Sequence, residues 1–105
     1  MRLDIRSLYR AVLFYEQCLD PLLTSSLGKS LRIFNDYVNF ISECSIVISC
    51  VGTPECKDGN INLDYVFQAA EQTAMYLKQD GIFVQKSTVP VGTGEKIEAL
   101  FCLWW

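Results

Sequence analysis

The sequence contains no histidine, and its five cysteines include no CxxC pair, so the common ligand combinations of a zinc site are absent. It has no run of about 18 uncharged apolar residues, which a membrane-spanning helix would need. Basic residues are few and scattered: nine Lys and Arg stand against twelve Asp and Glu, for a net charge of -3. A nucleic-acid surface needs clustered positive charge. We therefore expect no metal, no membrane and no nucleic acid as partners.

The odd number of cysteines argues against a disulfide framework and favours free thiols in a reducing compartment. They are Cys18, Cys44, Cys50, Cys56 and Cys102. Asp4, Arg6 and Arg10 interrupt the apolar stretch that a signal peptide would require, so we expect a cytoplasmic protein. With 105 residues, half of them hydrophobic, the chain can form a single domain with a core.

The first third of the chain is predicted to be mainly helical. A weak helical pattern extends over residues 1–12. A second helix is expected with Asp20 as its N-cap, Pro21 at its first position and Gly28 at its end, because these residue types favour those positions. Its core-facing residues would be Leu22, Leu23 and Leu27. Residues 31–34 are then predicted to form a short strand.

The later segments alternate between helix and strand. A short helix is predicted over residues 37–43, and the apolar, β-branched run at 45–51 is typical of a parallel strand covered on both faces. The next helix is expected to be capped by Asn62. Its core-facing stripe would be Leu63, Val66, Phe67, Ala70, Ala74 and Leu77. A strand at 82–84 and a helix at 95–100 complete the pattern, which predicts an α/β domain with a parallel sheet.

Small and polar residues follow two of the predicted strands at their carboxyl ends. Gly52, Thr53 and Pro54 follow the first of these strands, and Ser87 and Thr88 follow the second. In an open parallel sheet, ligands bind at this edge, where helix N-termini also expose unpaired N–H groups. The five residues are therefore candidates for binding an anionic or nucleotide ligand. Taken alone, a Thr-Pro pair after a strand more often forms only a turn.

Three segments resemble a known family. They are FYEQCLDPLL, CVGTPECKDGNINLDYV and QKSTVPVGTGEKIE, and the chain from about residue 13 to 100 is similar to the UDP-glucose/GDP-mannose dehydrogenases. The resemblance implies NAD as the cofactor and a nucleotide sugar such as UDP-glucose as the substrate. In that family the C6 alcohol is oxidised to a carboxylate by two hydride transfers. The similarity covers the later half of the family's N-terminal NAD-binding domain.

The resemblance also implies roles for individual residues. Thr53 matches a position that lines the NAD site, with Gly52 and Pro54 beside it. Thr88 matches the threonine that helps to hold the active-site water, which makes it the candidate catalytic residue, and Ser87 lies next to it. Lys86 matches less clearly, and a structural role is expected for it. Gln17 and Cys18 stand where the family has Pro and Gly, so the backbone of that loop is expected to differ.

Two motifs of the family are absent from this sequence: the GxGxxG turn and the segment around the catalytic cysteine. We therefore expect a partial Rossmann-like domain over residues 1–105. It would have three layers and a parallel sheet of about three strands, without the first βαβ unit. Such a chain would be marginally stable and inactive alone. The alternative is a non-catalytic remnant that binds a nucleotide or associates with another copy through an exposed sheet edge.

Overall fold

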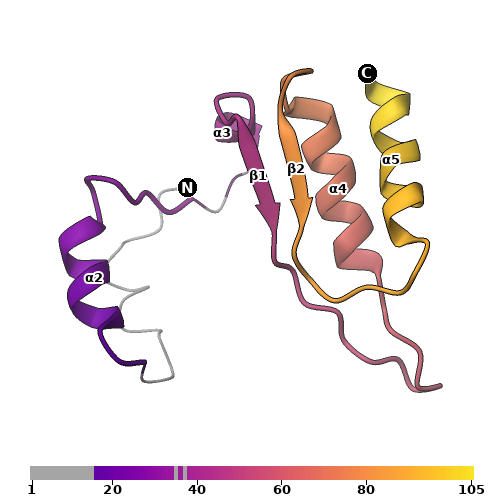
Figure 1. Cartoon of the computed structure of the whole chain (residues 1–105), viewed down its shortest axis with the longest axis horizontal. Coiled ribbons are helices and arrows are strands. Elements are labelled where there is room, and N and C mark those ends of the chain that lie inside the picture. The colour runs from indigo at the N-terminus through magenta and orange to yellow at the C-terminus, as the bar shows by residue number, and fades with distance from the viewer. Residues whose placement is uncertain (1–15, 35, 37) are drawn as a thin grey trace. The chain divides into compact units, whose positions relative to one another are not determined.

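The computed structural model describes residues 16–34, 36 and 38–105 (Figure 1). The chain divides into two compact units, residues 1–36 and 37–105, which are described separately below. The helix predicted over residues 1–12 lies outside the described residues. Among those described, no helix is both long and apolar enough to cross a bilayer.

The first unit contains helix α2, Leu19–Ser26, which begins earlier than predicted. Its N-cap is Cys18, in the left-handed conformation with φ of 67°, and not Asp20. Asp20 and Pro21 lie in the first turn, because the turn made by Cys18 already directs the chain into the helix. The predicted end is confirmed, since Gly28 follows the C-cap with φ of 77°.

Two other predictions for the first unit are wrong. Residues 31–34 form no strand, because Leu31 uses its backbone to close the turn after α2: its N–H donates to Ser26 O (3.0 Å) and its carbonyl accepts from Gly28 N (3.0 Å). Leu22 does not face a core, since its side chain is 64% exposed. Leu23 and Leu27 are half-buried, and α2 has no buried residue.

The second unit contains five elements: α3 (Val38–Ile41), β1 (Ile46–Ser49), α4 (Asp64–Tyr76), β2 (Ile82–Gln85) and α5 (Thr93–Trp104). The two strands pair in parallel, with Ile46 opposite Ile82 and Ser49 opposite Gln85. This confirms the α/β class with a parallel sheet. The described residues form two strands in place of the three expected, because the segment at 31–34 does not join the sheet.

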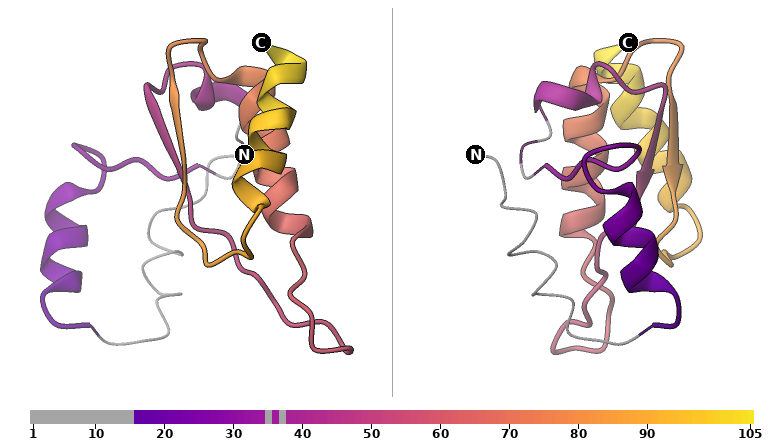
Figure 2. Two further views of the ribbon diagram at one scale, coloured as in Figure 1. Left: turned by 45° about the vertical axis from the view of Figure 1, so that its right-hand side comes forward. Right: turned by 90° about the vertical axis from the view of Figure 1, so that its left-hand side faces the viewer.

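Helices α4 and α5 pack side by side against one face of this sheet (Figure 2). The core between them consists of Ile41, Val66, Ala70, Ala74, Leu77, Ile97 and Phe101. The predicted apolar stripe of α4 is confirmed, since four of its residues are buried and the other two, Leu63 and Phe67, pack against the core. The N-cap of α4 is Leu63 and not the predicted Asn62. Asn62 lies just before it, and its Oδ1 accepts a 2.8 Å hydrogen bond from the N–H of Asp64. The stripe therefore fixes which face of the sheet is covered.

The opposite face of the sheet is exposed. Ile46 and Ile48 of β1 are 55% and 60% exposed, and Ile82 and Val84 of β2 also face outward on this side. No described element of the second unit covers them, so this unit has two layers and not the three predicted. The expectation that residues 45–51 are covered on both faces is likewise wrong. Successive side chains along a strand point to opposite faces of the sheet. The described helices of this unit all pack against one face, so the side chains on the other face remain exposed.

Candidate functional site

The two predicted ligand-binding segments meet at the carboxyl end of the sheet. Ser87 Oγ donates a 2.6 Å hydrogen bond to the carbonyl oxygen of Val51, and the N–H of Lys86 donates to Ser49 O at 2.8 Å. These bonds continue the β1–β2 register by two residues beyond the strands themselves. The segments that begin at Gly52 and Thr88 therefore leave the sheet from adjacent points.

The segment after β1 combines an open backbone with a half-buried hydroxyl. Gly52 is exposed, and a Cβ placed on it would meet nothing within 4 Å. Thr53 is half-buried, and Pro54 is exposed. The carbonyl of Pro54 accepts a 2.8 Å hydrogen bond from the N–H of Asn62, which holds the start of the loop against the start of α4. A ligand could thus approach the backbone of Gly52 closely.

The segment after β2 contains two hydroxyls in different situations. Ser87 is half-buried, and its hydroxyl already donates a hydrogen bond to the carbonyl oxygen of Val51. It can therefore only accept a hydrogen bond from a ligand. Thr88 is exposed. Lys86 is exposed too, while its backbone belongs to the ladder with β1. Thr88 is therefore the more accessible of the two hydroxyls.

Sequence reasoning missed Thr93, which fixes the loop between β2 and α5. Its side chain is only 3% exposed, and its Oγ1 donates a 2.7 Å hydrogen bond to Pro90 O. Its N–H bonds to the same carbonyl at 3.2 Å, and Gly92 before it has φ of 91°. The sequence signal that could have identified Thr93 is a threonine at a helix start, three positions after a proline. A hydrogen bond from such a hydroxyl to the nearby backbone is favoured.

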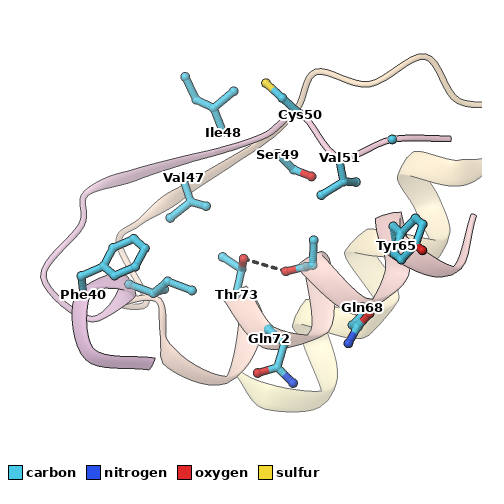
Figure 3. A pocket seen from close by; sticks show the side chains of 13 residues that line it. Phe40, Val47, Ile48, Ser49, Cys50, Val51, Tyr65, Gln68, Gln72 and Thr73 are labelled. Atoms are coloured by element: carbon cyan, nitrogen blue, oxygen red, sulfur yellow. Dashed lines mark hydrogen bonds between the residues drawn. The ribbon is translucent and has the colours of Figure 1, made fainter. Parts of the chain in front are cut away.

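Ser49 and Gln85 were also missed. They are cross-strand neighbours on the helix side of the sheet, and Ser49 Oγ and both amide atoms of Gln85 are buried without a hydrogen-bond partner. Ser49 lines a groove of about 600 Å³ between β1, α3 and α4 (Figure 3). The available signal was a polar side chain at position 49 inside an otherwise apolar strand.

The helix starts near the site are poorly suited to phosphate. A phosphate favours the positive N-terminal end of a helix, but α4 has Asp64 and α5 has Glu95 in the first turn. The N–H of Asp64 is also already bonded to Asn62. The site thus offers neutral hydroxyls and open backbone more than positive charge.

The loop before α4 closes on itself through Asp58. This side chain accepts hydrogen bonds from the side-chain amide of Asn60 (2.9 Å) and from its backbone N–H (3.1 Å). The side-chain bond, followed by the backbone bond, lowers the pKa of Asp58 below its ordinary value of 3.8. Gly59 between them has φ of 83°. Asp58 therefore stabilises its own turn.

The five cysteines are all free thiols, and three of them are exposed. In the part of the chain that the structure describes, no three Cys, Asp or Glu side chains gather as they would around a metal ion. Cys50 lines the groove beside β1, and Cys102 lies on α5.

A parallel strand pair joined by a helical crossover, with small and polar residues after each strand, is the arrangement of part of a Rossmann-like α/β domain. The chain belongs to the UDP-glucose/GDP-mannose dehydrogenase family, and the model of that family's NAD binding domain matches residues 5–102. This match extends beyond both ends of the resemblance inferred over residues 13–100. NAD is thus the cofactor associated with this domain.

Named relatives agree with the family. The chain is 38% identical over 98 residues to the UDP-glucose 6-dehydrogenase TuaD of Bacillus subtilis (strain 168), which covers 91% of this chain and 21% of TuaD. It is 37% identical over 90 residues to the UDP-glucose 6-dehydrogenase of Pseudomonas aeruginosa, and the match covers 85% of this chain and 20% of that enzyme. It is 34% identical over 87 residues to YwqF, a UDP-glucose 6-dehydrogenase of Bacillus subtilis, and the match covers 82% of this chain and 20% of YwqF. The chain thus spans about a fifth of the length of these relatives.

The described residues fit one part of a dinucleotide better than another. The open backbone at Gly52 and the hydroxyls of Thr53 and Thr88 suit the ribose and amide groups, which are neutral hydrogen-bonding partners. The acidic first turns of α4 and α5 do not suit the pyrophosphate. The fit is therefore to one side of the cofactor.

Proposed function

We propose that this chain forms the later half of the NAD site of a UDP-glucose 6-dehydrogenase-type enzyme and cannot turn over substrate by itself. The main support is the hydrogen bond from Ser87 Oγ to Val51 O, which aligns the two strand ends that present Thr53 and Thr88. The family match and the names of the relatives support NAD and a nucleotide sugar as ligands. NAD supplies the hydride acceptor.

In this proposal Thr88 is the residue nearest to the chemistry. Its hydroxyl is exposed at a strand end and would hold a water molecule near the reacting sugar carbon. Thr53, with Gly52 and Pro54, would line the cofactor side, and Ser87 would keep the two segments in register. A threonine hydroxyl cannot serve as an efficient acid or base near neutral pH, and the chain has no histidine. The proton transfers of the oxidation therefore need groups that these residues do not provide.

Titration of the isotope-labelled chain with NAD, followed by NMR, tests the binding claim. We expect chemical-shift changes concentrated at Thr53, Ser87 and Thr88, with weak, roughly millimolar affinity because only one side of the cofactor is contacted. Thr88→Val should weaken this response severalfold. Thr24→Val removes an exposed hydroxyl of the same type from α2 and should leave it unchanged. No response at several millimolar NAD would refute the proposal.

A spectrophotometric assay tests the claim that the chain is inactive alone. We expect no NADH absorbance with UDP-glucose or other nucleotide sugars. Steady NADH formation by the purified chain, lost in Thr88→Val, would contradict it. We also place the protein in the cytoplasm, where its free thiols would remain reduced. Fractionation of cells that express the chain would test this location.

A second candidate function is that of a non-catalytic interaction module. The specific observation in its favour is the exposed apolar face formed by Ile46, Ile48, Ile82 and Val84. Contiguous apolar surface of this kind marks interaction sites or aggregation-prone surfaces. If NAD produces no shifts while the chain associates in solution, the second candidate is favoured over the first.

A further inference from the structure

Two aspartates of this chain are directly followed by glycine. Asp58–Gly59 lies in the loop between β1 and α4, and Asp80–Gly81 lies in the turn that leads into β2. An Asp-Gly bond can rearrange without an enzyme: the glycine nitrogen attacks the aspartate Cγ, and the side-chain OH leaves as water together with the amide proton. The product is a five-membered succinimide ring. Glycine favours ring closure because it has no side chain to obstruct it and its backbone is the most adaptable.

Hydrolysis of the succinimide determines the final product. Water adds to one of the two ring carbonyls, so the ring opens either to aspartate again or to isoaspartate. In isoaspartate the main chain passes through the former side-chain carboxyl and is one carbon longer. One water leaves when the ring closes and one returns when it opens, so no other reactant is needed. The freedom of each Asp-Gly backbone to move therefore decides where the reaction occurs.

The backbone at Asp80–Gly81 is held firmly by its neighbours. The N–H of Gly81, whose nitrogen would be the nucleophile, donates a 2.8 Å hydrogen bond to Lys78 O. A Cβ at Gly81 would lie 2.6 Å from the Cγ of Leu77, which is a buried residue of the core. Strand β2 begins at the very next residue. The rotation that ring closure needs would therefore disturb both the core and the start of the sheet.

The backbone at Asp58–Gly59 is much less constrained. Both residues are exposed at the tip of a loop that extends past the start of α4 (Figure 1). The N–H of Gly59 donates to Cys56 O at 3.0 Å, and a Cβ at Gly59 would meet only the end of the Glu55 side chain, at 3.8 Å. A single antiparallel bridge between Glu55 and Ile61 closes the loop. Local opening of this tip breaks few contacts, so it needs little free energy.

Asn60 restrains the reaction at this tip. Its side-chain amide and its backbone N–H donate hydrogen bonds to the Asp58 carboxylate at 2.9 and 3.1 Å, and in that order they lower the pKa of Asp58 below 3.8. Ring closure proceeds from the neutral acid, since a carboxylate is a poor target for a nucleophile. Both bonds therefore oppose the reaction. They are exposed, so water competes for them and they open together with the tip.

We propose that Asp58 is the site of spontaneous isoaspartate formation in the folded chain, that Asn60 slows the reaction, and that packing protects Asp80. Opening of the tip exposes Asp58 to ring closure, whereas Asp80 reacts only after the start of β2 has separated. The added main-chain carbon would disturb the 2.8 Å bond between Asn62 N and Pro54 O, which holds the loop of the candidate site against α4. This inference does not depend on NAD binding.

Ageing of the full chain at neutral pH for several weeks tests the choice of site. An isoaspartate-specific carboxyl methyltransferase with a labelled methyl donor measures the total product, and peptide mapping by mass spectrometry assigns it to each aspartate. We expect at least fivefold more isoaspartate at Asp58 than at Asp80 in the folded chain, and similar amounts at both in urea. Equal amounts in the folded chain, the same excess of Asp58 in urea, or no product at Asp58 without urea would each overturn the proposal.

The variant Asn60→Ala tests the restraint. It removes the side-chain hydrogen bond to the Asp58 carboxylate and should accelerate isoaspartate formation there severalfold in the folded chain. In urea the same substitution should leave the rate unchanged, which separates the lost bond from a direct effect of the neighbouring side chain. Asp80 is the internal control, because a variant that fails to fold would also react faster at that position. An unchanged or slower rate at Asp58 would overturn the role assigned to Asn60.

Discussion

The hydroxyl of Ser87 donates a 2.6 Å hydrogen bond to the carbonyl oxygen of Val51, 36 residues earlier in the chain. It closes the carboxyl end of the sheet at the point where both predicted ligand-binding segments begin. The bond is partly buried, so water replaces it poorly when it is removed. The free energy of unfolding should therefore be sensitive to this one hydroxyl.

Ser87→Ala is expected to lower the free energy of unfolding by about 1–2 kcal/mol, since it leaves the carbonyl of Val51 without its partner. Urea denaturation followed by circular dichroism measures this. Thr88→Ala removes the neighbouring, exposed hydroxyl and should change stability by less than about 0.5 kcal/mol. Equal losses from the two substitutions would show that the Ser87–Val51 bond has no special role.

Gly81→Ala should be destabilising because of close packing behind the turn into β2. A Cβ at this position would lie 2.6 Å from Leu77 Cγ and 2.9 Å from Lys78 O. Overpacking of this kind costs about 1–3 kcal/mol. Gly94→Ala is the matched control: it lies in α5 with nothing within 4 Å of the added Cβ, and alanine should stabilise the helix by about 0.5–1 kcal/mol. Thermal unfolding should separate the two variants in opposite directions, and a shared direction would contradict the prediction.

Cys18→Gly should strengthen α2. Cys18 has φ of 67°, a left-handed conformation that costs a residue with a Cβ about 1–2 kcal/mol and costs glycine little. The greater chain entropy of glycine offsets part of this gain, so amide exchange in α2 should slow by about two- to threefold. The amide of Leu22, which bonds to Cys18 O at 3.4 Å, is a suitable probe. Cys18→Ala keeps a Cβ, and equal protection in that variant would exclude backbone strain as the cause.

The turn at Asp58 should lose stability in acid. The hydrogen bonds from Asn60 lower the pKa of Asp58 below 3.8, so the folded state favours the charged carboxylate. This contribution is present above pH 3.8 and disappears as the pH falls through the lower, folded-state pKa. An NMR titration of the Asp58 carboxyl should give the low value, and Asn60→Ala should return it toward 3.8. A titration midpoint unchanged by Asn60→Ala would refute the assignment.

The sequence predicted the second unit well because its signals are periodic. The stripe from Leu63 to Leu77 could bury one face only as a helix, and the β-branched runs before Gly52 and Ser87 form the two strands. The predictions were wrong where backbone conformation and backbone hydrogen bonds determine the local structure. Leu31 closes a turn with Gly28 and does not enter the sheet, and a cysteine adopts a conformation at position 18 that is usual for glycine.

The candidate site was predicted only in part for the same reason. The residues after each strand could be named from their order, since parallel strands end at one edge. The bond between Ser87 and the backbone of Val51 could not be predicted, because a carbonyl has no signal in the sequence. The unpartnered hydroxyl of Ser49 was also hidden, since burial and pairing depend on neighbours far along the chain.

Paired residues of β1 and β2, such as Ile46 and Ile82, lie 36 positions apart in the chain, and this distance also affects how the second unit folds. Closing a flexible loop of that length costs about 3 kcal/mol of chain entropy before any strand pairing can offset it. Helix α4 lies inside the loop, is local in sequence and carries the apolar stripe, so its formation shortens the flexible part. The helices should therefore assemble first and the parallel pair last. Until that last step, an uncharged apolar strand is exposed in every molecule, and the rate of strand closure then competes with aggregation during synthesis.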